Sequence, residues 1–245
     1  MAIKEFTPGV TEDEKTLATT PGSDLALPPR NYIEDDDAEG EFDITDERMP
    51  RIQIVAKTGS LADEFKPGTI LLNKEVTLAD KEQALKVIPV KMCKSFQEDI
   101  PYGSGIGDTV RKSEEVLARG GVLKYRPYNC PPDDFTRYWK PVLDILLLVE
   151  KPEHASEEAS MYFFTELDGK MYMPARFGAY SKTQYTAFSD PLVRLKRAGK
   201  SISSVVFSLS TTSKNRNGNS WIQVNIRPFG HTSDAVKKFL AANPL

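Results

Sequence analysis

The sequence predicts a mainly β protein, a curled antiparallel β-barrel with a few peripheral helices, preceded by an acidic flexible tail. Its alternating apolar segments follow one another directly, whereas a doubly wound sheet would need helices between them. Of the 245 residues, 40% are hydrophobic, which is enough for one sizeable core. Residues 1–47 combine Pro–Gly turns and an acidic run with few large apolar side chains. We therefore expect a tail at 1–47 and one domain at 48–245.

The first half of the domain is expected to form strands joined by polar loops and one short helix. Strands are expected at residues 51–56, 69–73, 84–96, 122–125 and 142–149. Pro89 lacks an N–H donor, so its strand must lie at a sheet edge or contain a bulge. A helix is expected at 109–119, with Thr109 as its N-cap and Gly120-Gly121 as its end. Residues 126–141 are expected to be a long surface loop.

The second half is expected to contain two hairpins and two helices. The hairpins pair residues 161–167 with 170–175, and 204–210 with 220–227. The first turns at Asp168-Gly169, a dipeptide that type I′ turns favour. A helix at 181–197 would begin at Ser181 and be divided by Pro191, with Leu192, Val193 and Leu195 inward. A last helix at 234–242 would be capped by Thr232 or Ser233.

The net charge of −3 conceals an uneven distribution of charge along the chain. Residues 1–50 hold four basic and fourteen acidic side chains, a net of −10, so residues 51–245 carry +7. Within residues 161–232, ten Lys and Arg face three acidic side chains. A cationic domain joined to an acidic tail indicates a polyanionic partner. The tail could compete for the cationic surface, recruit other proteins, or serve only as a solubilising segment.

Enzymatic, metal and cofactor sites are not expected from the motifs. The glycine loop 103–107 follows Pro101 and has the spacing G-x-G-x-G, which does not match a dinucleotide fingerprint. The two cysteines and two histidines form no metal or nucleophile pattern, and the acidic run 34–41 lacks calcium-loop spacing. No span of apolar residues is long enough for a membrane helix, and the first residues do not form a signal peptide. We therefore expect a cytoplasmic protein.

Aromatic and basic residues interleave between residues 161 and 229, the combination that single-stranded nucleic acids require for stacking and phosphate contacts. Trp221 alternates onto one strand face with Gln223, Asn225 and Arg227, opposite Ile222, Val224 and Ile226. A Trp among polar side chains is the best stacking candidate, although it could instead close the barrel or pack under the tail. Its expected stacking companions are Tyr172, Phe177 and Tyr180. Expected phosphate contacts are Arg176, Lys182, Arg194, Lys196, Arg197, Lys214, Arg216 and Arg227, although such clusters are often only solvated faces.

Several short sequence segments resemble those of the single-stranded-DNA-binding proteins that double-stranded-DNA bacteriophages encode near their replication genes. They lie at residues 50–60 (PRIQIVAKTGS), 66–71 (KPGTIL), 117–121 (LARGG) and 206–221 (VFSLSTTSKNRNGNSW), followed by Gly230. The resemblance implies an OB-like barrel, binding without sequence preference, and an acidic tail that meets replication proteins. In that family the tail is commonly C-terminal, whereas here it is N-terminal. The family has no sharp motif, so the resemblance transfers no binding residues.

These observations together predict a non-enzymatic protein that coats single-stranded DNA during phage replication or recombination. The alternative is a structural or accessory protein of a phage particle or polymerase complex that acts through protein contacts. The sequence leaves open the oligomeric state, including a homo-oligomer, and the choice between DNA and RNA.

Overall fold

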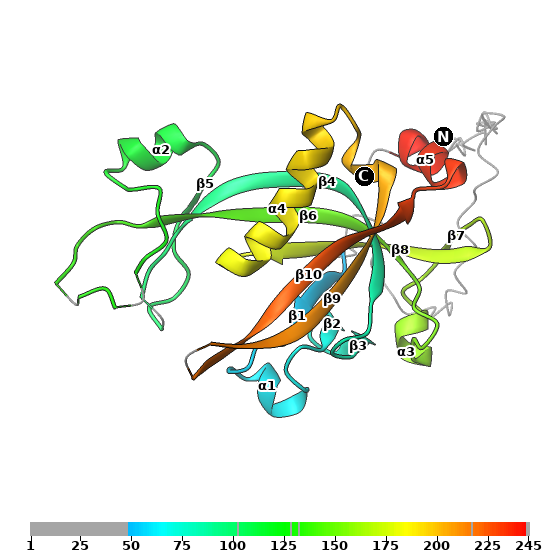
Figure 1. The fold of residues 1–245 in the computed structure, drawn as a ribbon, viewed down its shortest axis with the longest axis horizontal. Coiled ribbons are helices and arrows are strands. Elements are labelled where there is room, and N and C mark those ends of the chain that lie inside the picture. Colours follow the sequence, from blue (N-terminus) through cyan, green and yellow to red (C-terminus); the bar gives the residue numbers. More distant parts are fainter. Residues whose placement is uncertain (1–48, 102, 128, 132, 217, 244–245) are drawn as a thin grey trace, which may run out of the picture. The chain divides into compact units, whose positions relative to one another are not determined.

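A computed structural model describes residues 49–243, apart from residues 102, 128, 132 and 217 and the side chain of residue 216. The predicted tail at 1–47 lies outside the described residues. The described chain is mainly β, and its strands form one strongly curled sheet (Figure 1). The order along the sheet is β10-β9-β4-β6-β8-β1-β2-β3, with β5 paired to β4 and β7 paired to β8.

The strands are β1 (Arg51–Ile54), β2 (Ile70–Leu72), β3 (Val76–Ala79), β4 (Leu85–Glu98), β5 (Thr109–Val110), β6 (Trp139–Glu150), β7 (Thr165–Leu167), β8 (Lys170–Ala179), β9 (Val205–Arg216) and β10 (Asn219–His231). The helices are α1 (Leu61–Glu64), α2 (Ser113–Ala118), α3 (Glu157–Ser160), α4 (Lys182–Arg197) and α5 (Asp234–Ala242), with a 3-10 turn at Ile202–Ser204. Neighbouring strands pair antiparallel except for β1 and β8, which run parallel.

The main core lies on the concave side of the curled sheet. Successive strand side chains alternate between faces, and the odd-numbered residues of β6, β8 and β9 point inward. Helix α4 covers this side, where Phe188 and Leu192 are fully buried and the Phe188 ring lies 4.8 Å from that of Phe177. Helix α5 covers part of the convex side through Val236, which packs in a cluster with Tyr172. The two helices therefore cover opposite faces of the sheet.

Residues 99–138, between β4 and β6, form a lobe with a small core of its own. This core consists of Phe96, Val110, Val116 and Trp139. The Trp139 indole is fully buried, and a Cβ on Gly121 would lie 2.3 Å from its Nε1 atom. Only glycine fits at position 121, because any side chain there would displace the indole.

Several local predictions are confirmed. Asp168 and Gly169 both have positive φ at the β7–β8 turn, as a type I′ hairpin requires. Ser181 caps α4 in a capping box with Gln184, and Ser233 caps α5 by accepting from the Val236 N–H. The β9–β10 hairpin forms where it was predicted, and both of its strands are longer than predicted.

Other predictions are wrong, mainly where tertiary pairing overrides local signals. Thr109 belongs to β5, because it pairs with Gln97 of β4, and the helix begins only after Lys112. Residues 122–125 make only the isolated bridge Val122–Tyr138, and β6 already begins at Trp139 inside the expected loop. Strand β3 was not predicted. Pro141, which precedes the strand predicted at 142–149, lies inside β6 as the register partner of Phe96.

The structural effects of Pro89 in β4 and Pro191 in α4 differ in part from those that the sequence predicts. Pro89 lies in the interior strand β4, where the β6 pairing shifts register between Pro89 and Lys91, so the predicted bulge is confirmed and the edge position is not. Pro191 lies inside α4 without dividing it. The buried side chains of Phe188 and Leu192 on either side of Pro191 anchor the helix across this position. Val193 is exposed, contrary to the expected inward direction.

Candidate functional site

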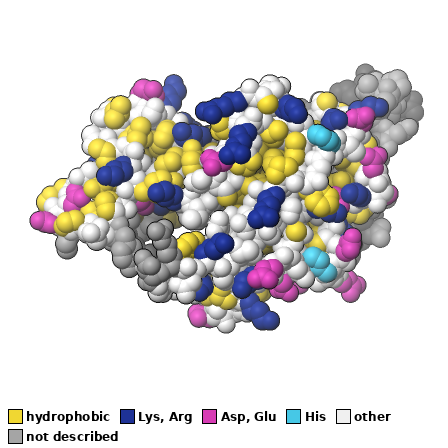
Figure 2. Space-filling model, in the orientation of Figure 1, with side chains coloured by type: hydrophobic (Ala, Val, Ile, Leu, Met, Phe, Trp, Pro, Cys, Tyr) yellow, Lys and Arg dark blue, Asp and Glu magenta, His cyan; other side chains and the backbone are white. Residues whose placement is uncertain are grey.

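A groove of about 800 Å³ runs between α4 and β10. Its floor consists of inward-facing aliphatic and aromatic side chains of the sheet, together with Leu195 of α4. The floor residues from the sheet are Val205, Phe207, Val224 and Ile226. Figure 2 shows apolar atoms between α4 and β10, bordered by Lys and Arg side chains. The groove therefore combines an apolar base with a cationic rim.

Four cationic side chains line the groove, and a single carboxylate, that of Asp190, accompanies them. The cations are Lys182, Arg194, Lys200 and Arg227, so the local sum is +3. None of the four forms an ion pair with another residue of the described chain. Unpaired cations around one groove produce a positive potential that attracts a polyanion.

Helix α4 and the turn after it position three of these cations. Lys182 lies in the first turn of the helix, and its ammonium group lies 5.7 Å from the centroid of the Tyr125 ring in the lobe. Arg194 lies in the last turn. Gly199 then adopts φ of +66°, which turns the chain so that Lys200 returns to the groove.

The β9–β10 hairpin presents a polar ribbon on the face opposite the core. Trp221 is half-buried and pairs with Lys214 across the two strands, so the two side chains share a face. Asn225 Nδ2 donates to Thr212 Oγ1 on this face, at 3.1 Å. Lys57 donates a hydrogen bond to Ser220 beside Trp221. The predicted alternation of β10 is confirmed, because Val224 is buried on the opposite face.

Two of the expected stacking rings are not on the surface. Tyr172 is 5% exposed under α5, and burial raises the pKa of its hydroxyl to about 12. Phe177 is 2% exposed in the main core against Phe188. Both assignments were wrong, because alternation identifies the face of a side chain but not the element that covers that face.

The Tyr180 ring is half-buried and is in contact with two other residues. A Cβ on Gly178 would lie 2.2 Å from Tyr180 Cε2, so the ring packs directly on that glycine. The Arg51 guanidinium carbon lies 5.5 Å from the ring centroid. Gly178 and Arg51 therefore hold the ring in place, and the expected stacking role of Tyr180 stays a prediction.

The remaining predicted cations are distributed over several surfaces. Lys196 and Arg197 are exposed on α4 but do not line the groove, and Arg176 is exposed on the convex face of β8. Lys214 is exposed beside Trp221 on the ribbon. The side chain of Arg216 lies outside the described residues. Of the twelve predicted residues, the structure gathers Lys182, Arg194 and Arg227 around the groove.

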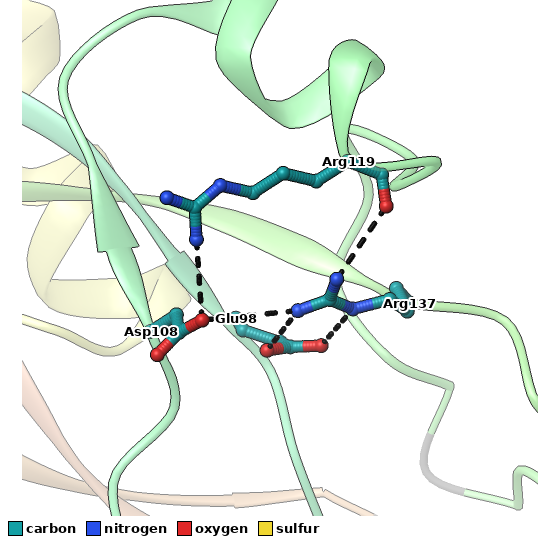
Figure 3. A network of polar contacts seen from close by, with 4 residues as sticks. All are labelled: Glu98, Asp108, Arg119 and Arg137. Carbon is teal, nitrogen blue, oxygen red and sulfur yellow. Dashed lines mark hydrogen bonds and ion pairs between the residues drawn. The ribbon is translucent and has the colours of Figure 1, made fainter.

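A network of ion pairs holds the base of the lobe (Figure 3). Arg137 donates to both carboxylate oxygens of Glu98, at 2.6 and 2.9 Å, and to the carbonyl oxygen of Arg119 at 3.4 Å. Arg119 in turn pairs with Asp108 at 3.2 Å. The hydrogen bonds from Arg137 lower the pKa of Glu98. The network fixes the lobe on the end of β4.

Sequence reasoning missed two features that the structure brings to the surface. Lys200 was counted only among the ten Lys and Arg of residues 161–232, although Gly199 before it signals the turn that returns it to the groove. Arg51 was not considered, because its position beside Tyr180 depends on the parallel pairing of β1 with β8. No local pattern reports such long-range pairing.

Within the described residues, no group of three or more His, Cys, Asp or Glu side chains could hold a metal ion. None of the described helices has both the length and the apolar composition that a membrane crossing demands. Comparisons of the chain with protein-family models, with curated proteins and with solved structures found no match.

Proposed function

We propose that the protein binds single-stranded DNA without sequence preference through the α4–β10 groove. The observation that carries the proposal is the set of four unpaired cations around an apolar floor. Phosphates would lie against the cations, and bases or sugars would lie against the floor. Trp221 on the adjoining ribbon supplies a half-buried ring for stacking.

The proposal includes the OB-like assignment and a non-enzymatic role in replication or recombination. A curled, mostly antiparallel sheet with a helix over its opening supports an OB-like reading. The sheet departs from the five-stranded OB pattern, because eight strands lie along its path and β10 does not pair with β3 in the described chain.

Binding to labelled oligo-dT and to a duplex of equal length, measured by fluorescence anisotropy at two salt concentrations, tests the proposal. The wild type should prefer the single strand, and Arg194→Glu with Arg227→Glu should abolish most binding. Lys237→Glu with Lys238→Glu, an equal charge change on α5, should have little effect, because neither residue lines the groove. No binding by the wild type, or equal effects of both changes, would refute the proposed site.

One observation favours the alternative function of protein contact. Five of the eight most exposed large hydrophobic residues in the described chain belong to the 99–138 lobe. They are Ile106, Leu117, Val122, Leu123 and Phe135. Ile106 and Phe135 are 90% and 91% exposed, which is typical of residues that meet a partner. Under this alternative, serine at both positions would reduce association with a partner, and oligonucleotides would not bind.

A further inference from the structure

A second hollow, of about 600 Å³, lies on the convex face of the sheet where the lobe begins. Residues of β4 and β6 form its base, and the glycine loop at 103–107 forms one wall. Gly107 is needed for this wall, because a Cβ there would lie 2.1 Å from the carbonyl oxygen of Glu98. Arg51 and Tyr180 stand together at its rim.

Tyr180 is held rigidly at this rim. Its ring packs on Gly178, and its hydroxyl donates to Asp144 Oδ1 at 2.7 Å. Burial, followed by this hydrogen bond, raises the pKa of Tyr180, so the hydroxyl stays protonated and keeps its donor role at neutral pH. The ring is therefore a fixed support for the Arg51 guanidinium, which lies over it.

Arg51 is also fixed through its own backbone. Its N–H donates to Asn73 Oδ1 at 2.8 Å, and its carbonyl oxygen accepts from the Asn73 N–H at 2.8 Å. A guanidinium that is anchored at the backbone and supported by a ring loses little entropy when a planar ligand stacks on it. Arg51 is exposed, so such a ligand can reach it.

The charges in the second hollow favour a base over a phosphate. Arg51 and Lys140 are balanced by Glu98 and Asp144, and Lys140 is already paired with Asp99 at 2.9 Å. The hollow therefore lacks the cationic excess of the α4–β10 groove. Gln97 and Ser95 provide polar groups for the edge of a base, beside the apolar side chains of Ile100 and Val142.

We propose that the second hollow is a nucleobase subsite, in which an unpaired base stacks on the Arg51 guanidinium. This inference rests on the proposed function. Tyr180 lines the second hollow and Lys182 lines the groove, and two residues of chain span at most about 7 Å. One nucleic-acid strand can therefore contact Tyr180 at the second hollow and Lys182 at the groove. Arginine planes are established platforms for unpaired bases.

The test compares wild type, Arg51→Gln and Arg51→Lys on oligo-dT of increasing length. The affinity of the wild type should rise once the oligonucleotide is long enough to reach the second hollow. Arg51→Gln should bind these longer oligonucleotides roughly 5- to 150-fold more weakly than the wild type, which is the factor for one stacked base. Arg51→Lys keeps the charge without the plane, so it should behave like Arg51→Gln. Full rescue by lysine would instead indicate a phosphate contact and overturn the base subsite.

Arg176→Gln is the matched control, because Arg176 is the exposed register partner of Arg51 on β8 and does not line the hollow. Scanning a single abasic residue along the oligonucleotide adds an independent readout. One abasic position should weaken wild-type binding and leave Arg51→Gln unaffected. If the wild type binds DNA and Arg51→Gln matches it at every length, the inference fails while the proposed function stands. If the wild type binds no DNA, both fail.

Discussion

The salt dependence of binding gives the sharpest prediction, because the four groove cations set its size. Each phosphate contact on a single strand contributes about −0.7 to the slope of log K against log salt concentration, so four contacts give about −2.8. Between about 50 and 200 mM salt, wild-type affinity should therefore fall about 50-fold. Replacing Arg194 and Arg227 with glutamine should halve the slope to about −1.4, and the same increase in salt should then lower the affinity about 7-fold.

Anisotropy of a labelled oligo-dT across a KCl series measures both slopes. Lys196→Gln is the matched control, because it removes a charge from the same helix without touching the groove, and its slope should stay close to that of the wild type. A double variant with the wild-type slope would refute the placement of phosphates in the groove. A flat wild-type response would refute ionic binding altogether.

Three further predictions concern the ribbon, the lobe and the tail. Trp221→Ala should weaken oligo-dT binding by about 1 to 3 kcal/mol and remove the quenching of fluorescence, because Trp139 is buried; unchanged affinity would exclude Trp221 from the site. Glu98 has a pKa held below its ordinary 4.5 by Arg137, so the pair stabilises the lobe above that pH and the contribution disappears as acid protonates Glu98. The melting temperatures of wild type and Glu98→Gln should therefore differ at about pH 7, and the difference should shrink as the pH falls below 4.5; a difference that does not change with pH would contradict this. Deleting residues 1–47 removes eleven net negative charges and should tighten DNA binding, whereas weaker binding would overturn competition by the tail.

The sequence predicts those features that depend on neighbours in the chain. The turn at Asp168-Gly169, the caps at Ser181 and Ser233, and the side of β10 that carries Trp221 all follow from local chemistry and the period of two. Each requires only a few consecutive residues. This explains why the β7–β8 turn and the starts of α4 and α5 were predicted correctly.

The site depends on contacts between distant segments, and these could not be predicted from local patterns. Tyr172 points outward from β8 as its alternation requires, but α5, more than sixty residues later, covers it. The groove likewise exists only because α4 packs beside β10, which no local pattern reveals. The distribution of charge in the sequence identified Arg194 and Arg227. The apolar floor between them forms only when the sheet is assembled, so the sequence could not predict it.

Strand β10 forms one boundary of the sheet, since it pairs only with β9 in the described chain. An unprotected strand of this length is a template for pairing with another molecule and for aggregation. Pro228 has no N–H to offer, the register shifts between Pro228 and Gly230, and Arg227 adds positive charge beside them. Two copies that pair along β10 would lack a backbone N–H donor at Pro228 and would meet an irregular backbone there. Their Arg227 side chains would also repel each other. Residues that border the groove thus also make this boundary a poor template for pairing with a second copy.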